Sequence, residues 1–179
     1  MNTNREFIVH KAQPKFEKHS NRADLAATYP KTDLVQVLSF LGFIVVIIAD
    51  LAFLTIFSPI HDLIPWYIRL IIAAPILIGA GLVSKKGINI VYGNIRDPPC
   101  VIESGPFRFS RHPMYLGALL FYLGIIILTF SVIGTIYYVG VIGLYNYLAR
   151  YEEMHLIQKF GQEYKSYMKK VSRWLGSRF

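Results

Sequence analysis

Two short runs of this chain combine residue types that can do chemistry. The first, GPFRFSRHPMYLG at 105–117, places Arg111 and His112 directly before Pro113. Proline suits the first position of a helix, because its missing N–H would have no helical partner there. The free N–H groups and the dipole of a helix N-terminus favour anions. The run therefore predicts a helix start with a cation and a titratable imidazole, suited to holding a carboxylate and moving a proton.

The second run contains two adjacent carboxylates, Glu152 and Glu153, which follow a long apolar segment. Carboxylates near a helix C-terminus are unfavourable with the helix dipole, so this pair indicates an ionic partner or a function. Arg111 and His112 alone have a simpler explanation, because basic residues often anchor helix ends at lipid headgroups. Together, the two runs favour a binding or catalytic site.

Long uncharged segments must position these runs. Of the 179 residues, 54% are hydrophobic and 17% are charged, whereas soluble domains have roughly a quarter charged residues. A spanning helix needs about 20 apolar residues, and four segments approach or exceed that length, at about 34–57, 65–84, 113–130 and 136–150. We predict an all-α integral membrane helical bundle of four transmembrane helices, or five, followed by a cytosolic amphipathic helix.

Basic residues predict the orientation, because Lys and Arg concentrate in cytoplasmic segments. Six lie in the arm 1–33, five in the connection 85–112 and seven from Arg150 onward, whereas the turns 58–64 and 131–135 have none. A three-span alternative would place basic segments on both sides. The pattern therefore predicts a multi-pass protein with both termini and the long connection in the cytoplasm.

We divide the chain into a polar N-terminal arm, 1–33, and one membrane-embedded domain, 34–179. The cytosolic tail of that domain, 151–179, is predicted to bend or restart its helix at Gly161. An apolar stripe at helical spacing predicts that this helix lies on the membrane or against the bundle. The stripe consists of Phe160, Tyr164, Tyr167, Val171 and Trp174.

The remaining charges and the single cysteine restrict the function. The net charge is +8, and the charged residues lie mainly between the apolar segments. This distribution favours anionic lipid over nucleic acid as a partner. The lone Cys100 excludes an internal disulfide, and we predict no metal site. Asp50 and Arg69 lie inside apolar segments at similar depths, so we predict a structural ion pair between them.

The predicted topology returns the second run to the depth of the first. Arg111 and the helix start would suit the carboxylate of a zwitterionic ligand, and Glu152 or Glu153 would suit its ammonium group or a hydroxyl. An adenine or a cation would be faced by the rings of Tyr115, Tyr151, Tyr164 and Tyr167.

These two runs together resemble a known protein family. The run at 105–117, followed by EE-x(6)-FG-x-x-Y-x-x-Y-x-x-x-V-x-R, resembles the isoprenylcysteine carboxyl methyltransferase and phospholipid methyltransferase superfamily over about residues 85–173. The resemblance implies an enzyme that binds S-adenosyl-L-methionine at the cytosolic face. The catalytic candidates are Arg111, His112 and Glu153, and Arg173 is the substrate-binding candidate. The cofactor-binding candidates are His112, Pro113, Tyr115, Gly117, Glu152, Glu153 and Tyr164.

We therefore predict methyl transfer to a lipidic or small hydrophobic acceptor within the bilayer. The acceptor is either a carboxylate, as in prenylcysteine O-methylation, or an amine, as in phospholipid N-methylation. A carboxylate needs no general base, whereas an amine needs one such as His112 or Glu153. The alternatives are an NADPH-dependent reductase of related fold and a non-enzymatic scaffold or transporter subunit. The gathering of charge at one face disfavours transport.

Overall fold

The computed structural model describes residues 32–53, 63–94 and 101–176, so the predicted arm up to residue 31 and Cys100 lie outside the described residues. Four long helices make up most of the described chain, in accord with the predicted all-α class. They are α1 (Thr32–Phe53), α3 (Trp66–Ile88), α4 (Pro113–Thr129) and α5 (Val132–Phe160). A further short helix, α6 (Gln162–Lys170), follows α5.

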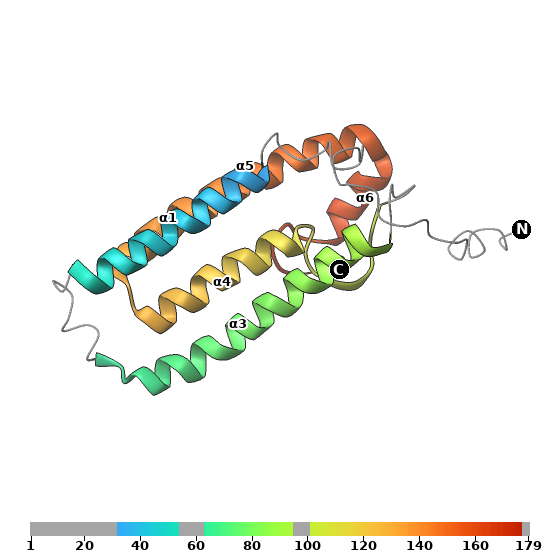
Figure 1. Cartoon of the computed structure of the whole chain (residues 1–179). Helices are drawn as coiled ribbons and strands as arrows, with labels where there is room; N and C mark the ends of the chain where they lie inside the picture. Colours follow the sequence, from blue (N-terminus) through green and yellow to red (C-terminus); the bar gives the residue numbers. More distant parts are fainter. Residues whose placement is uncertain (1–31, 54–62, 95–100, 177–179) are drawn as a thin grey trace, which may run out of the picture.

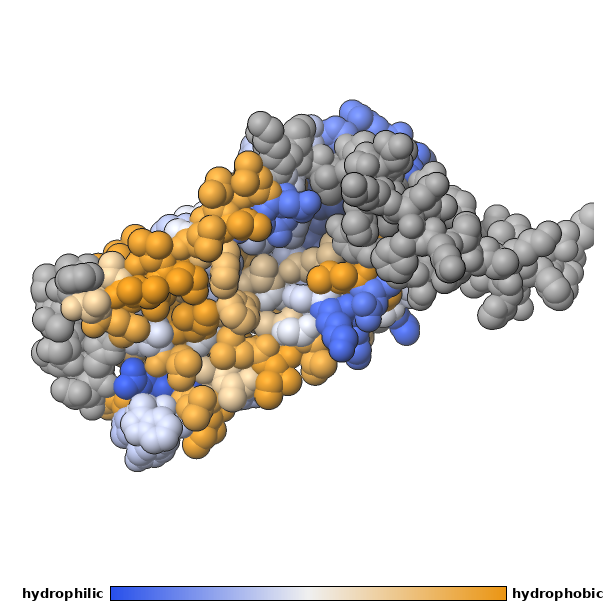
Figure 2. Space-filling view, in the orientation of Figure 1, coloured by the Kyte–Doolittle hydropathy of each residue, from blue (hydrophilic) through white to orange (hydrophobic). Residues whose placement is uncertain are grey.

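Three of these helices have the length and composition to cross a membrane. The candidate spans are Thr32–Ala52, Trp66–Val91 and Val132–Phe160. Helix α4 is equally apolar but has 17 residues, which cover about 26 Å of a hydrocarbon core about 30 Å thick. The face shown in Figure 2 is mainly hydrophobic along these helices, and hydrophilic side chains gather toward the end that carries α6.

The helices run alternately up and down the bundle. Helix α1 packs against α5, and α3 packs along α4. As a result, the start of α1, the end of α3, the start of α4 and the end of α5 all lie at the end that carries α6 (Figure 1). We call this the α6 end, and the end with the turn between α4 and α5 the turn end.

The turn between α4 and α5 is shorter than predicted. Phe130 adopts a left-handed φ of 56°, and the Ser131 side chain accepts the backbone N–H of Gly134 at 2.8 Å. A left-handed residue followed by a serine N-cap reverses the chain within two residues. Helix α5 therefore begins at Val132 rather than Ile136, and the predicted turn over residues 131–135 is wrong.

The second predicted span also has a different end. Helix α3 continues past Lys85 and Lys86 to Ile88, and a π-helical turn, Asn89–Asn94, extends it. The predicted end of the second span at residue 84 is therefore too early. The two lysines lie in the last turn of α3, where the helix dipole favours cations.

The two charges within the apolar segments do not form the predicted pair. The buried Asp50 carboxylate accepts a hydrogen bond from the Ser131 hydroxyl. Arg69 donates to the carbonyl oxygen of Leu128 at 3.4 Å. Both side chains reach the region of the α4–α5 turn, so the prediction that Asp50 and Arg69 lie at similar depths is correct. They contact polar atoms of that region instead of each other. Within the described ranges no ion pair joins Asp50 and Arg69.

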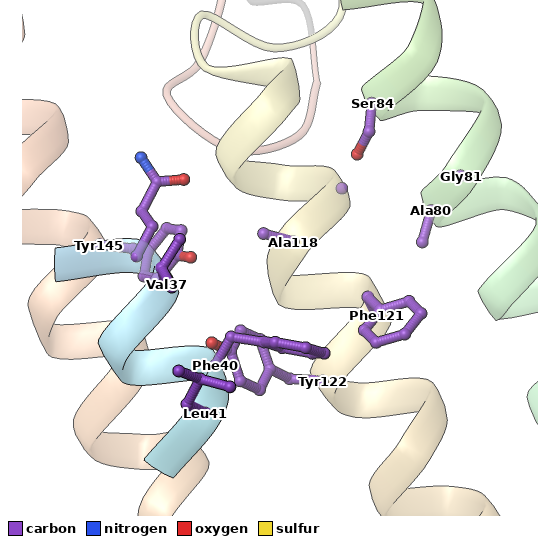
Figure 3. Close-up of a pocket in the computed structure, with 12 residues that line it drawn as sticks. Val37, Phe40, Leu41, Ala80, Gly81, Ser84, Ala118, Phe121, Tyr122 and Tyr145 are labelled. Atoms are coloured by element: carbon purple, nitrogen blue, oxygen red, sulfur yellow. The ribbon is translucent and has the colours of Figure 1, made fainter. Parts of the chain in front are cut away.

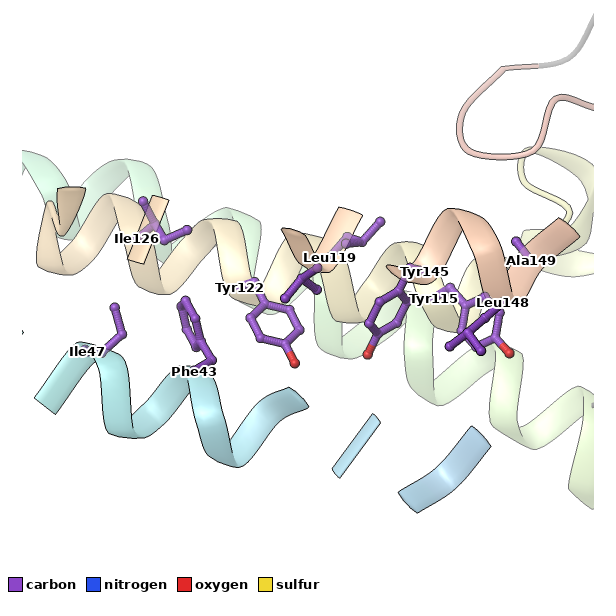
Figure 4. Packing of buried hydrophobic residues seen from close by; sticks show 10 residues of the cluster. Phe43, Ile47, Tyr115, Leu119, Tyr122, Ile126, Tyr145, Leu148 and Ala149 are labelled. Carbon is purple, nitrogen blue, oxygen red and sulfur yellow. The ribbon is translucent and has the colours of Figure 1, made fainter. Parts of the chain in front are cut away.

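Aromatic rings form a column through the core of the bundle (Figure 4). Phe43 of α1 meets Tyr122 of α4 edge-on, with ring centroids 4.7 Å apart. Tyr145 of α5 lies 6.5 Å from Tyr122 and 5.4 Å from Tyr115, again edge-on. Tyr115 in turn stacks on His112 at 5.5 Å. Because such rings are stiff and tightly packed, the column fixes the position of the imidazole at the α6 end.

Candidate active site

The first site segment is fixed by the residues on either side of His112. Pro113 is buried at the first position of α4, as predicted. The backbone N–H of His112 donates to Ser110 Oγ at 3.2 Å, and that hydroxyl donates to the carbonyl oxygen of Arg173 at 3.0 Å. The imidazole lies parallel to the Tyr115 ring, with an angle of 6° between the two planes. These contacts direct the His112 ring into the bundle instead of toward solvent.

The second site segment lies on the last turns of α5. The helix remains continuous past Ala149, the end of its apolar part, so it carries Glu152 and Glu153 to the α6 end. His112 lies between the two acids, with Nδ1 3.3 Å from Glu152 Oε2 and Nε2 3.2 Å from Glu153 Oε1. The predicted meeting of the two runs is therefore present in the structure, while the chemical roles of these residues stay predictions.

Glu153 is the centre of the charged cluster and is only 3% exposed. Arg173 donates to both carboxylate oxygens of Glu153, with Nε 3.0 Å from Oε1 and Nη2 2.6 Å from Oε2. Arg111 Nη1 lies 3.2 Å from Oε1. One carboxylate thus faces Arg111, His112 and Arg173, and a forked arginine contact of this kind fixes geometry as well as charge.

Burial and charge act in opposite directions on the titration of this cluster. Burial alone would lower the pKa of His112, but hydrogen bonds and charge interactions with Glu152 and Glu153 outweigh it and raise that pKa. For Glu153, burial would raise the pKa, but the His112 and Arg173 hydrogen bonds and the nearby charges bring that pKa down to about 2. These contacts therefore favour the charged forms of both the imidazole and the Glu153 carboxylate.

The C-terminal segment brings Arg173 into the site. Gly161, with a φ of 56°, ends α5 and lets α6 turn back toward the connection before α4. The Tyr167 hydroxyl donates to the carbonyl oxygen of Phe107 at 2.6 Å. Past α6, the backbone N–H of Arg111 donates to the carbonyl oxygen of Ser172 at 3.2 Å. The segment after α6 is thereby tied to the residues immediately before His112.

The predicted restart at Gly161 is confirmed, but the amphipathic helix is shorter than its apolar stripe. Helix α6 ends at Lys170, so Val171 and Trp174 lie beyond it. Tyr164, Tyr167 and Val171 form a small buried cluster, whereas Trp174 packs against the main core. The stripe thus predicts burial correctly but not the extent of the helix.

Two other predicted site residues have different surroundings. Gly117 faces α3, and an added Cβ there would lie 2.1 Å from Ser84 Oγ, so close packing of α4 against α3 already requires glycine. Tyr164 is 3% exposed, and its hydroxyl has no hydrogen-bond partner in the described part of the chain. The cofactor-binding roles of both remain predictions.

Asn146 is a site residue that sequence reasoning missed. Its Oδ1 accepts Arg173 Nη1 at 2.8 Å, so Asn146 and Glu153 together hold all three guanidinium nitrogens of Arg173. Asn146 precedes Glu153 by two helical turns, which places both on one face of α5. The spacing between Asn146 and Glu153 is visible in the sequence, and it is the signal that could have identified Asn146.

An apolar groove of about 450 Å³ opens beside the site. Its walls come from α1 and α3, and its floor comes from α4 (Figure 3). Residues Phe40 and Leu41 of α1 lie across α4 from Ala80 and Gly81 of α3. Tyr145 also lines the groove, and its ring touches Tyr115. The groove therefore leads from the apolar surface of the bundle toward the ring that stacks on His112.

Fold and site together define a membrane-type helical bundle with a buried charged cluster at one end. The phospholipid methyltransferase family model matches residues 69–163, which is more than half of the chain. The chain belongs to this family, which indicates a methyltransferase that acts on a phospholipid-type substrate. The match confirms the resemblance seen in the two runs and favours the transferase over the reductase and scaffold alternatives. Neither the curated proteins nor the solved structures that were compared with the chain gave a match.

Proposed function

We propose that this protein transfers a methyl group from S-adenosyl-L-methionine to the headgroup amine of a membrane phospholipid. The observation that carries the proposal is the buried cluster in which His112 lies between Glu152 and Glu153, in a chain of the phospholipid methyltransferase family. The basic residues near the α6 end support a cytoplasmic position for the site.

The donor set of the cluster fits a zwitterionic cofactor. Arg111 has two buried guanidinium nitrogens without a hydrogen bond among the described residues, and they suit a carboxylate. Glu152 is the more open of the two acids, with 21% of its side chain exposed against 5% for Glu153, so we assign it to an ammonium group. S-adenosyl-L-methionine supplies an already activated methyl group, and the chain must mainly align the reacting groups. Such alignment is worth about 7–11 kcal/mol of the barrier.

The charge states in the cluster limit which residue takes a proton from an amine acceptor. The two acids favour the protonated form of His112, and contacts with His112, Arg111 and Arg173 favour the ionised form of Glu153. Neither is therefore a good base in this arrangement, although both were candidates from the sequence. We assign His112, Glu153 and Arg173 to positioning and charge balance, and the proton of the acceptor amine leaves to solvent at the open side of the cluster, where Glu152 lies.

The apolar groove supports a lipid acceptor over a small soluble one. A diacyl lipid stays in the bilayer, so its headgroup must reach the site from the side. The groove between α1 and α3 offers such a path, because its lining is mainly apolar. Its inner end meets the Tyr145–Tyr115–His112 stack, so an acyl chain held there would keep a headgroup near the charged cluster.

Titration calorimetry with S-adenosylhomocysteine tests the cofactor assignment. We expect the detergent-solubilised wild-type protein to bind it, and Glu152→Ala and His112→Ala to bind on the order of tenfold more weakly or worse, because each loses a charge-assisted contact. Absence of binding by the wild-type protein, or undiminished binding by both variants, would contradict the proposal.

Two glycines of α3 form a matched pair that tests the groove. Gly81 lines it and Gly79 does not, and at both positions an added Cβ meets nothing within 4 Å. We expect Gly81→Phe to raise the KM for a long-chain phosphatidylethanolamine in mixed micelles several-fold, with unchanged binding of S-adenosylhomocysteine. Gly79→Phe adds the same bulk outside the groove and should match wild type. Equal effects of the two variants would remove the groove from the acceptor path.

A further inference from the structure

Two polar side chains lie on opposite walls of the mainly apolar groove between α1 and α3. Gln36 belongs to the α1 wall and Ser84 to the α3 wall. Both residues are half-buried, and neither side chain makes a hydrogen bond within the described ranges. A carboxamide and a serine hydroxyl can each donate a hydrogen bond. The groove therefore offers two donors that the fold does not use.

Contacts between the helices place these two donors at one depth. Phe40 of α1 lies 5.9 Å from Phe121 of α4, measured between the ring centroids. Gln36 and Gly117 precede these two residues by one helical turn each, so they lie closer to the α6 end. Ser84 lies at the same depth, because its Oγ is the nearest atom to a Cβ added at Gly117. Gln36, Ser84 and Gly117 thus form one layer of the groove, which we call the polar layer.

The next layer of the groove, one turn farther from the α6 end, is apolar (Figure 3). Its members are Phe40, Leu41, Ala80, Gly81 and Phe121. Tyr122 also lines this layer, but its hydroxyl is paired with the Ser39 hydroxyl at 3.2 Å. Polarity along the groove therefore falls from the α6 end toward the turn end. A diacyl phospholipid has the same order, because its glycerol esters precede its acyl chains.

The polar layer also lies at a suitable distance from the charged cluster. The ring of Tyr145 touches Tyr115 and Tyr122, which lie on either side of Gly117 along α4. Glu152 follows Tyr145 by two turns of α5, which is about 10 Å along the helix axis. The ethanolamine phosphate unit of a phospholipid separates its amine from its glycerol esters by a comparable length. An amine at the charged cluster would therefore leave the ester carbonyls beside the polar layer.

From this arrangement we infer that Gln36 and Ser84 donate hydrogen bonds to the ester carbonyl oxygens of a diacyl glycerophospholipid. The inference rests on the proposed function and specifies the class of lipid that its groove accepts. An ester offers a carbonyl oxygen to each donor, whereas an ether-linked lipid has no carbonyl oxygen at this position. The polar layer thus selects ester-linked over ether-linked phospholipids, and Gln36 and Ser84 are specificity-determining residues.

Diacyl and dialkyl phosphatidylethanolamine of equal chain length test this selectivity. In mixed micelles, the wild-type KM for the diacyl lipid should be about three- to tenfold below that for the dialkyl lipid. Ser84→Ala and Gln36→Leu should each raise the KM for the diacyl lipid and leave that for the dialkyl lipid unchanged, because only the diacyl lipid loses a hydrogen bond. Equal wild-type KM values for the two lipids would overturn the inference.

Ser39 provides a matched control for the Ser84 hydroxyl. It is buried, its hydroxyl contacts that of Tyr122, and it lies outside the lining of this groove. Ser39→Ala removes a hydroxyl that the fold uses, so it should lower the melting temperature and keep the wild-type preference for the diacyl lipid. If Ser39→Ala lost that preference as completely as Ser84→Ala, a direct contact of Ser84 with the ester would be refuted.

A binding measurement separates this inference from the proposed function. The diacyl lipid should raise the melting temperature of the wild-type protein in micelles more than the dialkyl lipid does, and Ser84→Ala and Gln36→Leu should reduce this difference. If the wild-type protein shows this response but binds no S-adenosylhomocysteine, the proposed function fails and the ester site stands. If it methylates both lipids with equal KM and equal melting shifts, the ester site is refuted while the proposed function stands.

Discussion

The two ends of the bundle treat buried charge in different ways. At the turn end, the buried carboxylate of Asp50 reaches a neutral partner, the Ser131 hydroxyl. At the α6 end, titratable groups contact one another, and Glu153 alone faces Arg111, His112 and Arg173. A charge held by the polar atoms of a turn is part of the fold. Under the proposed function, the charged cluster at the α6 end instead holds a ligand.

Removing the Glu153 carboxylate is the strongest test of this difference between the two ends. Glu153→Ala leaves Arg111, His112 and Arg173 facing one another without their shared anion, and such a loss typically costs about 3–5 kcal/mol. We expect a large fall in the melting temperature in detergent and loss of S-adenosylhomocysteine binding.

The neighbouring acid is the control for that variant. Glu152 is more exposed and contacts His112 alone among the described cations, so Glu152→Ala should lower stability by about 1 kcal/mol or less. Similar melting temperatures for the two variants would show that Glu153 is not the centre of the cluster.

A smaller effect is expected at the turn end. Asp50→Ala leaves the Ser131 hydroxyl without its acceptor and should reduce stability by about 1–3 kcal/mol. Asp50→Asn keeps an oxygen that accepts the same hydrogen bond, so it should lie close to wild type. Neither change should alter the affinity for S-adenosylhomocysteine measured by calorimetry.

The turn-end prediction has a clear contrary outcome. If Asp50→Asn folded normally but abolished methyl transfer, Asp50 would belong to the function and the contrast between the ends would fail. The same comparison made with Ser131→Ala, which removes the other half of the contact, would show whether the effect comes from the hydrogen bond or from the charge.

Sequence patterns predicted the α6 end better than the turn end, for physical reasons. Apolar length and the positions of Lys and Arg are properties of whole segments, so they correctly predicted that Glu152 and Glu153 return to His112. The partners of Asp50 and Arg69 depend on which atoms of a two-residue turn point inward, and spacing along separate helices carries no such information. The short turn itself depended on the left-handed Phe130, a conformation that residues other than glycine seldom adopt.

The same limit applies to the segment after α6. The stripe predicted the burial of Tyr164 and Tyr167, because helical spacing fixes which side chains share a face. It did not predict that one hydroxyl would find a carbonyl and the other none. That difference depends on the position of Phe107, which a connection rich in turn residues leaves undetermined at the level of sequence.

The position of α1 has a consequence for how such an enzyme can diversify. The family match begins at Arg69 and covers most of α3 and all of α4 and α5, but not α1. Helix α1 nevertheless supplies one wall of the groove through Val37, Phe40 and Leu41. Under the proposed function, substitutions along that wall would change which acyl chains are accepted without touching the charged cluster. Selectivity for the lipid and the chemistry of transfer would then be separately adjustable parts of one small bundle.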